Sequence, residues 1–224
     1  WQRYRSFDYG LDMFACYWWA VDEDGRSWCY REFTHKGLIV KEAADKIHEL
    51  TLPGEHIAAT YAPPDMWSRQ KDTGKTMAEV FMLNQVGLIK ADNNRVQGHM
   101  MMKEAMAPYP LRDPHVQAMF RRDDGAVPDK LPGLLFFNTC KGAIGDIQDI
   151  QADEKNPNDC AKDPHEVTHT VDGVRYYCVS RVLPAESIQE KEPVFWDDEE
   201  DDAPEDYAGY MTGGEVTAGY LGAG

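Results

Sequence analysis

The sequence predicts an α/β domain built on a mixed β-sheet. Near the start of the chain, two apolar strands are separated by the turn sequence Asp-Glu-Asp-Gly at 22–25, a pattern typical of an antiparallel hairpin. Short buried strands then alternate with helical segments, as in strand–helix units. The chain has 224 residues and is 42% hydrophobic, so it can bury the core of one full domain.

The strands are predicted from alternating polarity or from short apolar runs between turn signals. The expected strands are residues 4–9, 13–21, 27–33, 56–60, 88–91 and 134–138. Five prolines interrupt residues 108–133, so this segment is expected to be a loop.

The helices are predicted from apolar residues at helical spacing. The expected helices are residues 38–50, 76–86, 95–107 and 164–181. A further helix carries Ile144, Ile147 and Ile150, and either Asn138 or Thr139 is expected to cap its start.

The sequence Gly-Lys-Thr at 74–76 has part of the pattern of a phosphate-binding loop. No glycine stands upstream at the spacing that this loop requires, and no strand leads directly into it. A capped helix start explains the residues better, with Thr73 or Thr76 as the N-cap and Glu79 in the first turn.

The formal net charge of −16 is unevenly distributed along the chain. Residues 185–207 hold eleven acidic residues against the single base Lys191, so this segment contributes −10. We therefore expect one domain over residues 1–185 and a flexible acidic and glycine-rich tail over residues 186–224. The overall acidity argues against a broad basic surface for nucleic acid, although carboxylates that hold metal ions no longer count as net negative charge.

Cysteine usage and hydropathy predict a protein of a reducing cytoplasm without a membrane span. The five cysteines are odd in number and none are spaced C-x-x-C, which argues against a disulfide framework and a cysteine zinc site. No apolar run approaches the roughly 18 residues of a membrane span. The chain begins with Trp1 and shows no signal segment, so we expect it to be an excerpt of a longer protein.

Residues 165–169 read His-Glu-Val-Thr-His, the H-E-x-x-H pattern of zinc metallopeptidases. Such an enzyme uses the two histidines as zinc ligands and the glutamate, here Glu166, as general base, and it needs a third ligand from elsewhere. The third-ligand candidates by position are Glu186, Glu190 and Glu192. A zinc metallopeptidase is therefore one alternative function.

The helix around this motif is expected to have one chemical face and one buried face. At about 100° per residue, the chemical face carries His165, His169, Asp172 and Tyr176. The expected buried face carries Val167, Val171, Val174 and Cys178. Two imidazoles and a carboxylate on one face indicate a chemical role more than a merely solvated surface.

Two more aspartates lie at the ends of predicted buried strands. Asp8 is followed by Gly10, which leaves room for close approach of another group, and Asp65 follows two prolines that restrict its direction. Together with Asp172 they offer three carboxylates, which are hard ligands that favour Mg²⁺ or Mn²⁺ over Zn²⁺. A pair of such ions can promote cleavage of a phosphodiester bond, as in ribonuclease-H-like nucleases.

The order of these motifs resembles one family. The resembling stretches are FDYGLDMFACYWWAVDEDG, YAPPDMWSRQKDTGKTMAEVF, ADNNRVQG and NPNDCAKDPHEVTHTVDGVRYY, which cover most of residues 4–181. They are similar to the C-terminal nuclease domain of the large terminase subunit of tailed bacteriophages or prophages. The resemblance implies an RNase-H-like fold and metal-dependent cleavage of double-stranded DNA.

The resemblance also implies roles for individual residues. The catalytic, metal-binding acids map onto Asp8, Asp65 and Asp172, which would hold two Mg²⁺ or Mn²⁺ ions. Many relatives have the middle acid two residues earlier, where this chain has Pro63, and Asp65 is the carboxylate available in that turn. Auxiliary candidates are Asp12, His165 and His169. The candidates for DNA contact are Arg95, Lys103 and Arg175, of which Arg175 can instead pair with an acid.

Partners and location follow from the same resemblance. The substrate would be concatemeric double-stranded DNA, and the partners would be an N-terminal packaging ATPase domain of the full-length chain, the portal protein and the small terminase subunit, with no membrane. The expected location is the host cytoplasm, transiently at the procapsid portal. The alternatives to a packaging nuclease are the zinc peptidase, a non-catalytic module that docks on the portal, and another RNase-H-like nuclease such as a junction resolvase.

Overall fold

The computed structural model describes residues 1–10, 12–71, 74–161 and 163–181. The tail that the sequence predicts from residue 186 lies outside the described residues, as do the three glutamates considered as zinc ligands.

A six-stranded mixed sheet forms the centre of the described chain, in the order β5-β4-β1-β2-β3-β8. Its strands are β1 (Gln2–Tyr9), β2 (Phe14–Val21), β3 (Ser27–His35), β4 (Ile57–Ala62), β5 (Ile89–Lys90) and β8 (Leu134–Phe136). Of these six, β2 alone runs against its neighbours, while β4 pairs in parallel with β1, β5 with β4, and β8 with β3. The predicted α/β class, with a central mixed sheet, is confirmed.

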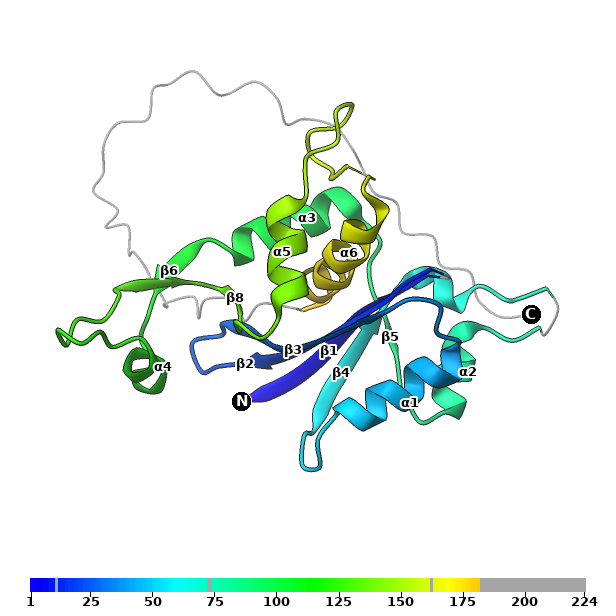
Figure 1. Ribbon diagram of the computed structural model, residues 1–224, viewed down its shortest axis with the longest axis horizontal. Helices are drawn as coiled ribbons and strands as arrows, with labels where there is room; N and C mark the ends of the chain where they lie inside the picture. Colours follow the sequence, from blue (N-terminus) through cyan, green and yellow to red (C-terminus); the bar gives the residue numbers. More distant parts are fainter. Residues whose placement is uncertain (11, 72–73, 162, 182–224) are drawn as a thin grey trace, which may run out of the picture. The chain divides into compact units, whose positions relative to one another are not determined.

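Helices cover both faces of the sheet, as Figure 1 shows. One face carries α3 (Arg95–Ala105), α5 (Lys141–Asp149) and α6 (His165–Ser180), and the opposite face carries α1 (Val40–Leu50) and α2 (Met77–Leu83). The result is a three-layer α/β/α arrangement with a separate hydrophobic core on each side of the sheet.

Strand β2 divides its side chains between the two cores. Ala15, Tyr17 and Trp19 pack toward α3, α5 and α6, while Phe14, Cys16 and Trp18 pack toward α1 and α2. Because successive side chains of a strand point to opposite faces, an apolar run of this length fits a strand that is covered on both sides.

The local signals at helix starts are confirmed for one helix and wrong for another. Thr76 caps α2 by accepting a hydrogen bond from the Glu79 backbone N–H at 3.0 Å, and the Glu79 side chain accepts from the Thr76 N–H at 2.7 Å. Helix α5 instead begins after Cys140, so neither Asn138 nor Thr139 is its N-cap. The chain turns once more after β8 before α5 starts, which shifts the cap by one residue beyond the prediction.

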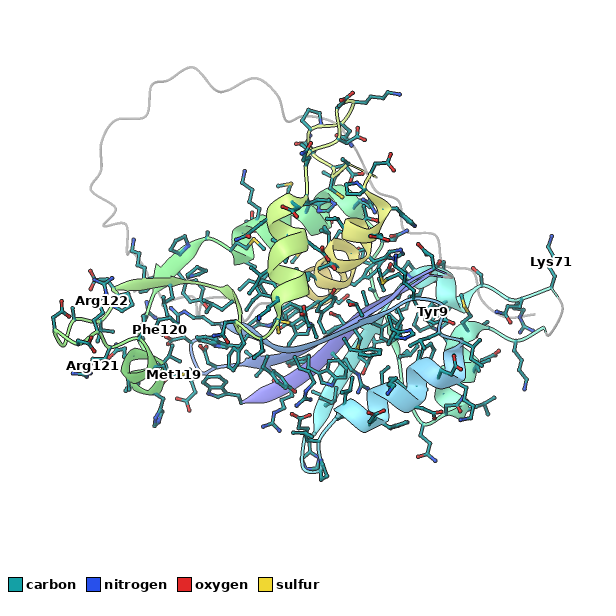
Figure 2. All side chains as sticks on the ribbon, in the orientation of Figure 1. Tyr9, Lys71, Met119, Phe120, Arg121 and Arg122 are labelled. Carbon is teal, nitrogen blue, oxygen red and sulfur yellow. The ribbon has the colours of Figure 1, made fainter. Side chains whose placement is uncertain are left out.

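The segment expected to be a loop, residues 108–133, contains regular structure. It forms a two-stranded antiparallel pair, β6 (Pro108–Pro110) and β7 (Lys130–Pro132), and the short helix α4 (Pro114–Met119). A small core of Leu111, Val116 and Leu131 packs on Trp28, and Phe120 also contacts Trp28, with ring centroids 6.0 Å apart. Figure 2 labels Met119 to Arg122 in this segment.

Helix α6 departs from the predicted two-faced pattern. Its valine face is buried as expected, but His169 and Tyr176 on the other face are also buried, at 5% exposure each. The helix contacts β1, β2 and β4 on one side and α3 and α5 on others, so it is enclosed from several directions. Gly173 permits the close approach, because a Cβ there would lie 2.9 Å from the Tyr17 ring.

All five cysteines are buried and unbridged. Among the described residues, no helix combines the length and the apolar character needed to cross a membrane.

Candidate active site

The candidate site lies at the carboxyl ends of β1 and β4. These strands pair in parallel, with Ser6 opposite Tyr61, so both strands end at the same edge of the sheet. Asp8 lies two residues beyond Ser6, and Asp65 lies four residues beyond Tyr61. The carboxyl edge of neighbouring parallel strands is where α/β folds place their binding sites. Tyr9, labelled in Figure 2, marks this edge at the end of β1.

Asp8 is a largely buried carboxylate with a histidine partner. Its Oδ2 atom lies 2.6 Å from Nδ1 of His169 on α6. Burial raises the pKa of Asp8, and the charges of Asp172 and Asp65 raise it further, against the lowering effect of the His169 hydrogen bond. The net upward shift means that this carboxylate is costly to ionise without a compensating positive charge.

Asp65 stands in the short 3₁₀ helix η1 (Pro64–Trp67) that follows β4. Pro63 and Pro64 set the direction of the chain here, and the buried Met66 holds η1 against the sheet. The Asp65 side chain is exposed, and its charge nevertheless acts on Asp8.

Asp172 is held by two arginines. Arg95 at the start of α3 donates from Nη1 to both Asp172 carboxylate oxygens, at 3.1 and 3.0 Å, and Arg175 one turn along α6 donates from Nε to Oδ1 at 2.9 Å. Arg95 also donates from Nε to both oxygens of Asp159 at 3.1 Å. Burial opposes the charge of Arg95, but the hydrogen bond to Asp159 and the charges of Asp172 and Asp159 raise the Arg95 pKa above its ordinary value.

The pKa of Tyr176 is affected by the charges of all three candidate acids, Asp8, Asp65 and Asp172. Burial raises the pKa of its hydroxyl well above the ordinary value, and the charges of Asp8, Asp172 and Asp65 each raise it further. Asp8, Asp65 and Asp172 therefore all lie near enough to Tyr176 to affect its hydroxyl, but they are not among the groups of described residues whose ligand atoms lie close enough together for one ion.

The predicted auxiliary residues gather beside Asp8. Nε2 of His169 lies 3.2 Å from Oδ2 of Asp12, and Nε2 of His165 lies 3.4 Å from the same oxygen. The hydrogen bond to Asp8 raises the pKa of His169, and the charges of Asp8 and Asp12 add to this against the effect of burial. Gly10 provides the room, because a Cβ there would lie 2.9 Å from Asp12 Oδ1 and 3.0 Å from the His169 ring.

The three residues predicted to contact DNA occupy different surroundings. Lys103 on α3 is exposed, Arg175 is completely buried against Asp172 and the Tyr176 ring, and Arg95 is half-buried between two carboxylates.

The sequence patterns gave no role to Asp159, although it lies in the stretch Asn-Pro-Asn-Asp-Cys. An acid two residues after a proline is too common a pattern to identify Arg95 of α3 as its partner.

Two solved structures are similar to this chain. One is the nuclease domain of the g2p large terminase from bacteriophage SPP1 with bound Mn, at 15% sequence identity and a TM-score of 0.46, covering 78% of this chain and 84% of that one. The other is the nuclease domain of the P22 large terminase, at 16% identity and a TM-score of 0.48, covering 81% of this chain and 82% of that one. No protein-family model and no curated protein sequence matches the chain.

Proposed function

We propose that this chain is the metal-dependent endonuclease domain of a viral DNA-packaging terminase, which hydrolyses phosphodiester bonds in concatemeric double-stranded DNA. The proposal is supported by the positions of Asp8, Asp65 and Asp172, which all lie near enough to the buried Tyr176 for their charges to raise the pKa of its hydroxyl. The three acids come from β1, η1 and α6, and carboxylate oxygens are the hard ligands that Mg²⁺ and Mn²⁺ prefer.

The proposed cofactor is a pair of Mg²⁺ or Mn²⁺ ions. Asp8 is largely buried, and the charges of Asp172 and Asp65 add to the cost of ionising it, a cost that divalent cations would relieve. In this proposal Asp8, Asp65 and Asp172 would hold the ions. When bound, such ions supply charge stabilisation at the scissile phosphate and make water a stronger nucleophile.

The other side chains hold this ligand set in position. His169 contacts Asp8 from α6, so it fixes the orientation of that carboxylate. Arg95 and Arg175 direct Asp172 through three hydrogen bonds. A restrained ligand set reduces the reorganisation needed when metal and phosphate bind.

The wider assignment follows the resemblance of the sequence motifs. The substrate is double-stranded DNA, and the partners are an N-terminal packaging ATPase domain of the same full-length chain, the portal protein and the small terminase subunit. The domain then acts in the host cytoplasm and transiently at the procapsid portal.

The test is cleavage of supercoiled plasmid DNA by the purified protein with Mg²⁺ or Mn²⁺. We expect nicking and linearisation that chelation abolishes, and a loss of about a hundredfold or more in rate for Asp8→Asn, Asp65→Asn and Asp172→Asn. Asp45→Asn is the matched control, because Asp45 is exposed on α1 on the opposite face of the sheet. Undiminished cutting by Asp8→Asn, or no cutting by the folded wild type with either metal, overturns the proposal, and a preference for branched DNA favours a junction resolvase.

A further inference from the structure

A second group of candidate metal ligands lies beside the three acids. It consists of Asp12 in the turn between β1 and β2 and of His165 and His169 on α6. Asp12 Oδ2 lies 3.2 Å from Nε2 of His169 and 3.4 Å from Nε2 of His165. Ligand atoms around a tetrahedral zinc ion with bonds of about 2.0–2.1 Å are about 3.3 Å apart, so these separations suit one ion.

Both histidines are oriented to ligate through Nε2. Nδ1 of His169 is hydrogen-bonded to Asp8 at 2.6 Å, and Nδ1 of His165 lies 3.3 Å from Oγ1 of Thr168. Metal-binding histidines commonly donate their second ring nitrogen to a carboxylate or another acceptor, which fixes the tautomer and leaves the first nitrogen for the ion. The His169–Asp8 contact is an arrangement of this kind.

The site is open to solvent and separate from Glu166. The side chains of Asp12 and His165 are 54% and 64% exposed, so an ion can enter and keep a water ligand. Glu166 pairs instead with Lys36, which directly follows β3. The H-E-x-x-H sequence therefore supplies two ligands here, while its glutamate is not placed as the general base of a peptidase.

Another group with suitable ligand types is less favourable for a cation. His99, Asp159 and Cys160 also lie close together. The guanidinium of Arg95 already contacts Asp159, and its Nη2 lies 3.1 Å from the Cys160 sulfur. Arg95 therefore already occupies two of the three candidate ligands of that group, whereas Asp12 is contacted by the two histidines of its own group.

We propose that Asp12, His165 and His169 form a binding site for Zn²⁺ or a similar borderline transition-metal ion, distinct from the Mg²⁺ or Mn²⁺ site of the proposed nuclease. Imidazole nitrogens select such ions, while carboxylates alone favour the harder cations. The ion would link the β1–β2 turn to the start of α6 and hold His169 against Asp8.

The test measures Zn²⁺ binding to the metal-free protein by calorimetry in excess Mg²⁺, and Co²⁺ binding by its visible absorption. We expect one equivalent of Zn²⁺ that Mg²⁺ does not displace, and a Co²⁺ spectrum of low coordination number. His165→Ala and Asp12→Asn should weaken binding by about a hundredfold or more, since loss of even an outer partner costs about 10–100-fold. Asp8→Asn, which removes that outer partner, should weaken it by about 10–100-fold.

Control variants separate this site from its neighbours. Glu166→Gln, Asp172→Asn and His99→Ala should bind Zn²⁺ as the wild type does, with folding checked by circular dichroism. Absence of stoichiometric Zn²⁺ binding overturns the proposal, as does loss of binding in His99→Ala with retention in His165→Ala. Because no DNA is present, these outcomes do not depend on whether the chain cuts DNA.

Discussion

At the scale of single residues, the three candidate acids differ in how firmly they are held. Asp172 accepts hydrogen bonds from two guanidinium groups and Asp8 is bonded to His169, whereas Asp65 is exposed. The three acids could be selected from the sequence because each follows a buried strand or lies on a patterned helix. Their partners could not, because Arg95 and Asp159 are 64 positions apart and local patterns carry no information on such pairs.

The cost of ionising Asp8 should appear in the stability of the protein. Mg²⁺ at about 100 times its dissociation constant should stabilise the wild type by about 2.7 kcal/mol, by mass action on the folded state. Asp8→Asn should lose most of this gain, while it keeps the stability of the metal-free wild type because the amide needs no counter-charge. Thermal unfolding in Mg²⁺ and in chelator measures both, with Asp45→Asn as control. Equal stabilisation of Asp8→Asn would show that Asp8 is not a ligand.

A pH effect is expected from Asp24 in the turn between β2 and β3. It accepts hydrogen bonds from the backbone N–H groups of Arg112 and Asp113, at 2.7 and 2.9 Å, and from the Arg26 guanidinium. Burial alone would raise the pKa of Asp24, but these hydrogen bonds lower it below its ordinary value. The stability from Asp24 is therefore present above pH of about 4, the unfolded value, and is lost as the pH falls toward the folded value.

Urea unfolding of Asp24→Asn tests this effect. At pH 7 we expect a loss of about 1.5–3 kcal/mol, the usual contribution of hydrogen bonds to a charged group, and a shallower decline of stability on acidification. Asp123→Asn is the control, because Asp123 is exposed in the segment 108–133, which also contains the two backbone donors to Asp24. An unchanged acid dependence in Asp24→Asn would contradict the assignment.

At the scale of elements, the long helices follow their sequence patterns closely, and the proline-rich segment does not. Helices α1, α3 and α6 begin and end within two residues of the predicted bounds, because several turns of periodic apolar residues define them. Strands β6 and β7 have three residues each, too few for alternation to be visible, and two of the three residues in β6 are prolines. Their pairing depends on the core around Trp28, which only the folded chain brings together.

The contact between α3 and α6 depends on Gly98. A Cβ at this position would lie 2.6 Å from Cγ and 2.9 Å from Cδ of Arg175, whose guanidinium is tied to Asp172. Alanine raises helix propensity by about 1 kcal/mol, but overpacking costs about 1–3 kcal/mol, so Gly98→Ala should be neutral to destabilising and should reduce DNA cleavage by displacing Asp172.

Gly145→Ala on α5 is the matched control for this substitution. Within the described part of the chain, a Cβ at Gly145 would meet no atom of another element within 4 Å. This substitution should therefore stabilise the protein by up to about 1 kcal/mol and leave cleavage unchanged. Urea unfolding and the plasmid assay compare the two variants. Equal stabilisation by both would show that α3 and α6 are not closely packed at Gly98.

At the scale of the whole molecule, the net negative charge of the chain opposes binding of the proposed DNA substrate. The chain carries a formal net charge of −16, although its proposed substrate is a polyanion. Within the described residues, Arg95 and Arg175 are directed at carboxylates instead of the surface. Bound divalent ions would therefore provide much of the local positive charge at the site.

Removal of residues 186–224 should strengthen DNA binding. This segment contains most of the acidic excess, so its removal reduces long-range repulsion of DNA. We expect several-fold tighter binding of a short duplex at low salt in Ca²⁺, and a difference that shrinks as salt screens the repulsion. Fluorescence anisotropy at two salt concentrations measures it. Equal affinities at low salt would indicate that the acidic segment does not influence the DNA-binding surface.

The double burial of β2 has a consequence for how the domain opens. Its amide groups are bonded to β1 on one side and β3 on the other, beneath helices on both faces, so they should be among the last to exchange with solvent deuterium. β5 and β8 lie at the margins of the sheet and can detach first. Asp8 is paired directly with Ala15 of β2, so this carboxylate should keep its place through partial opening events that loosen the margins.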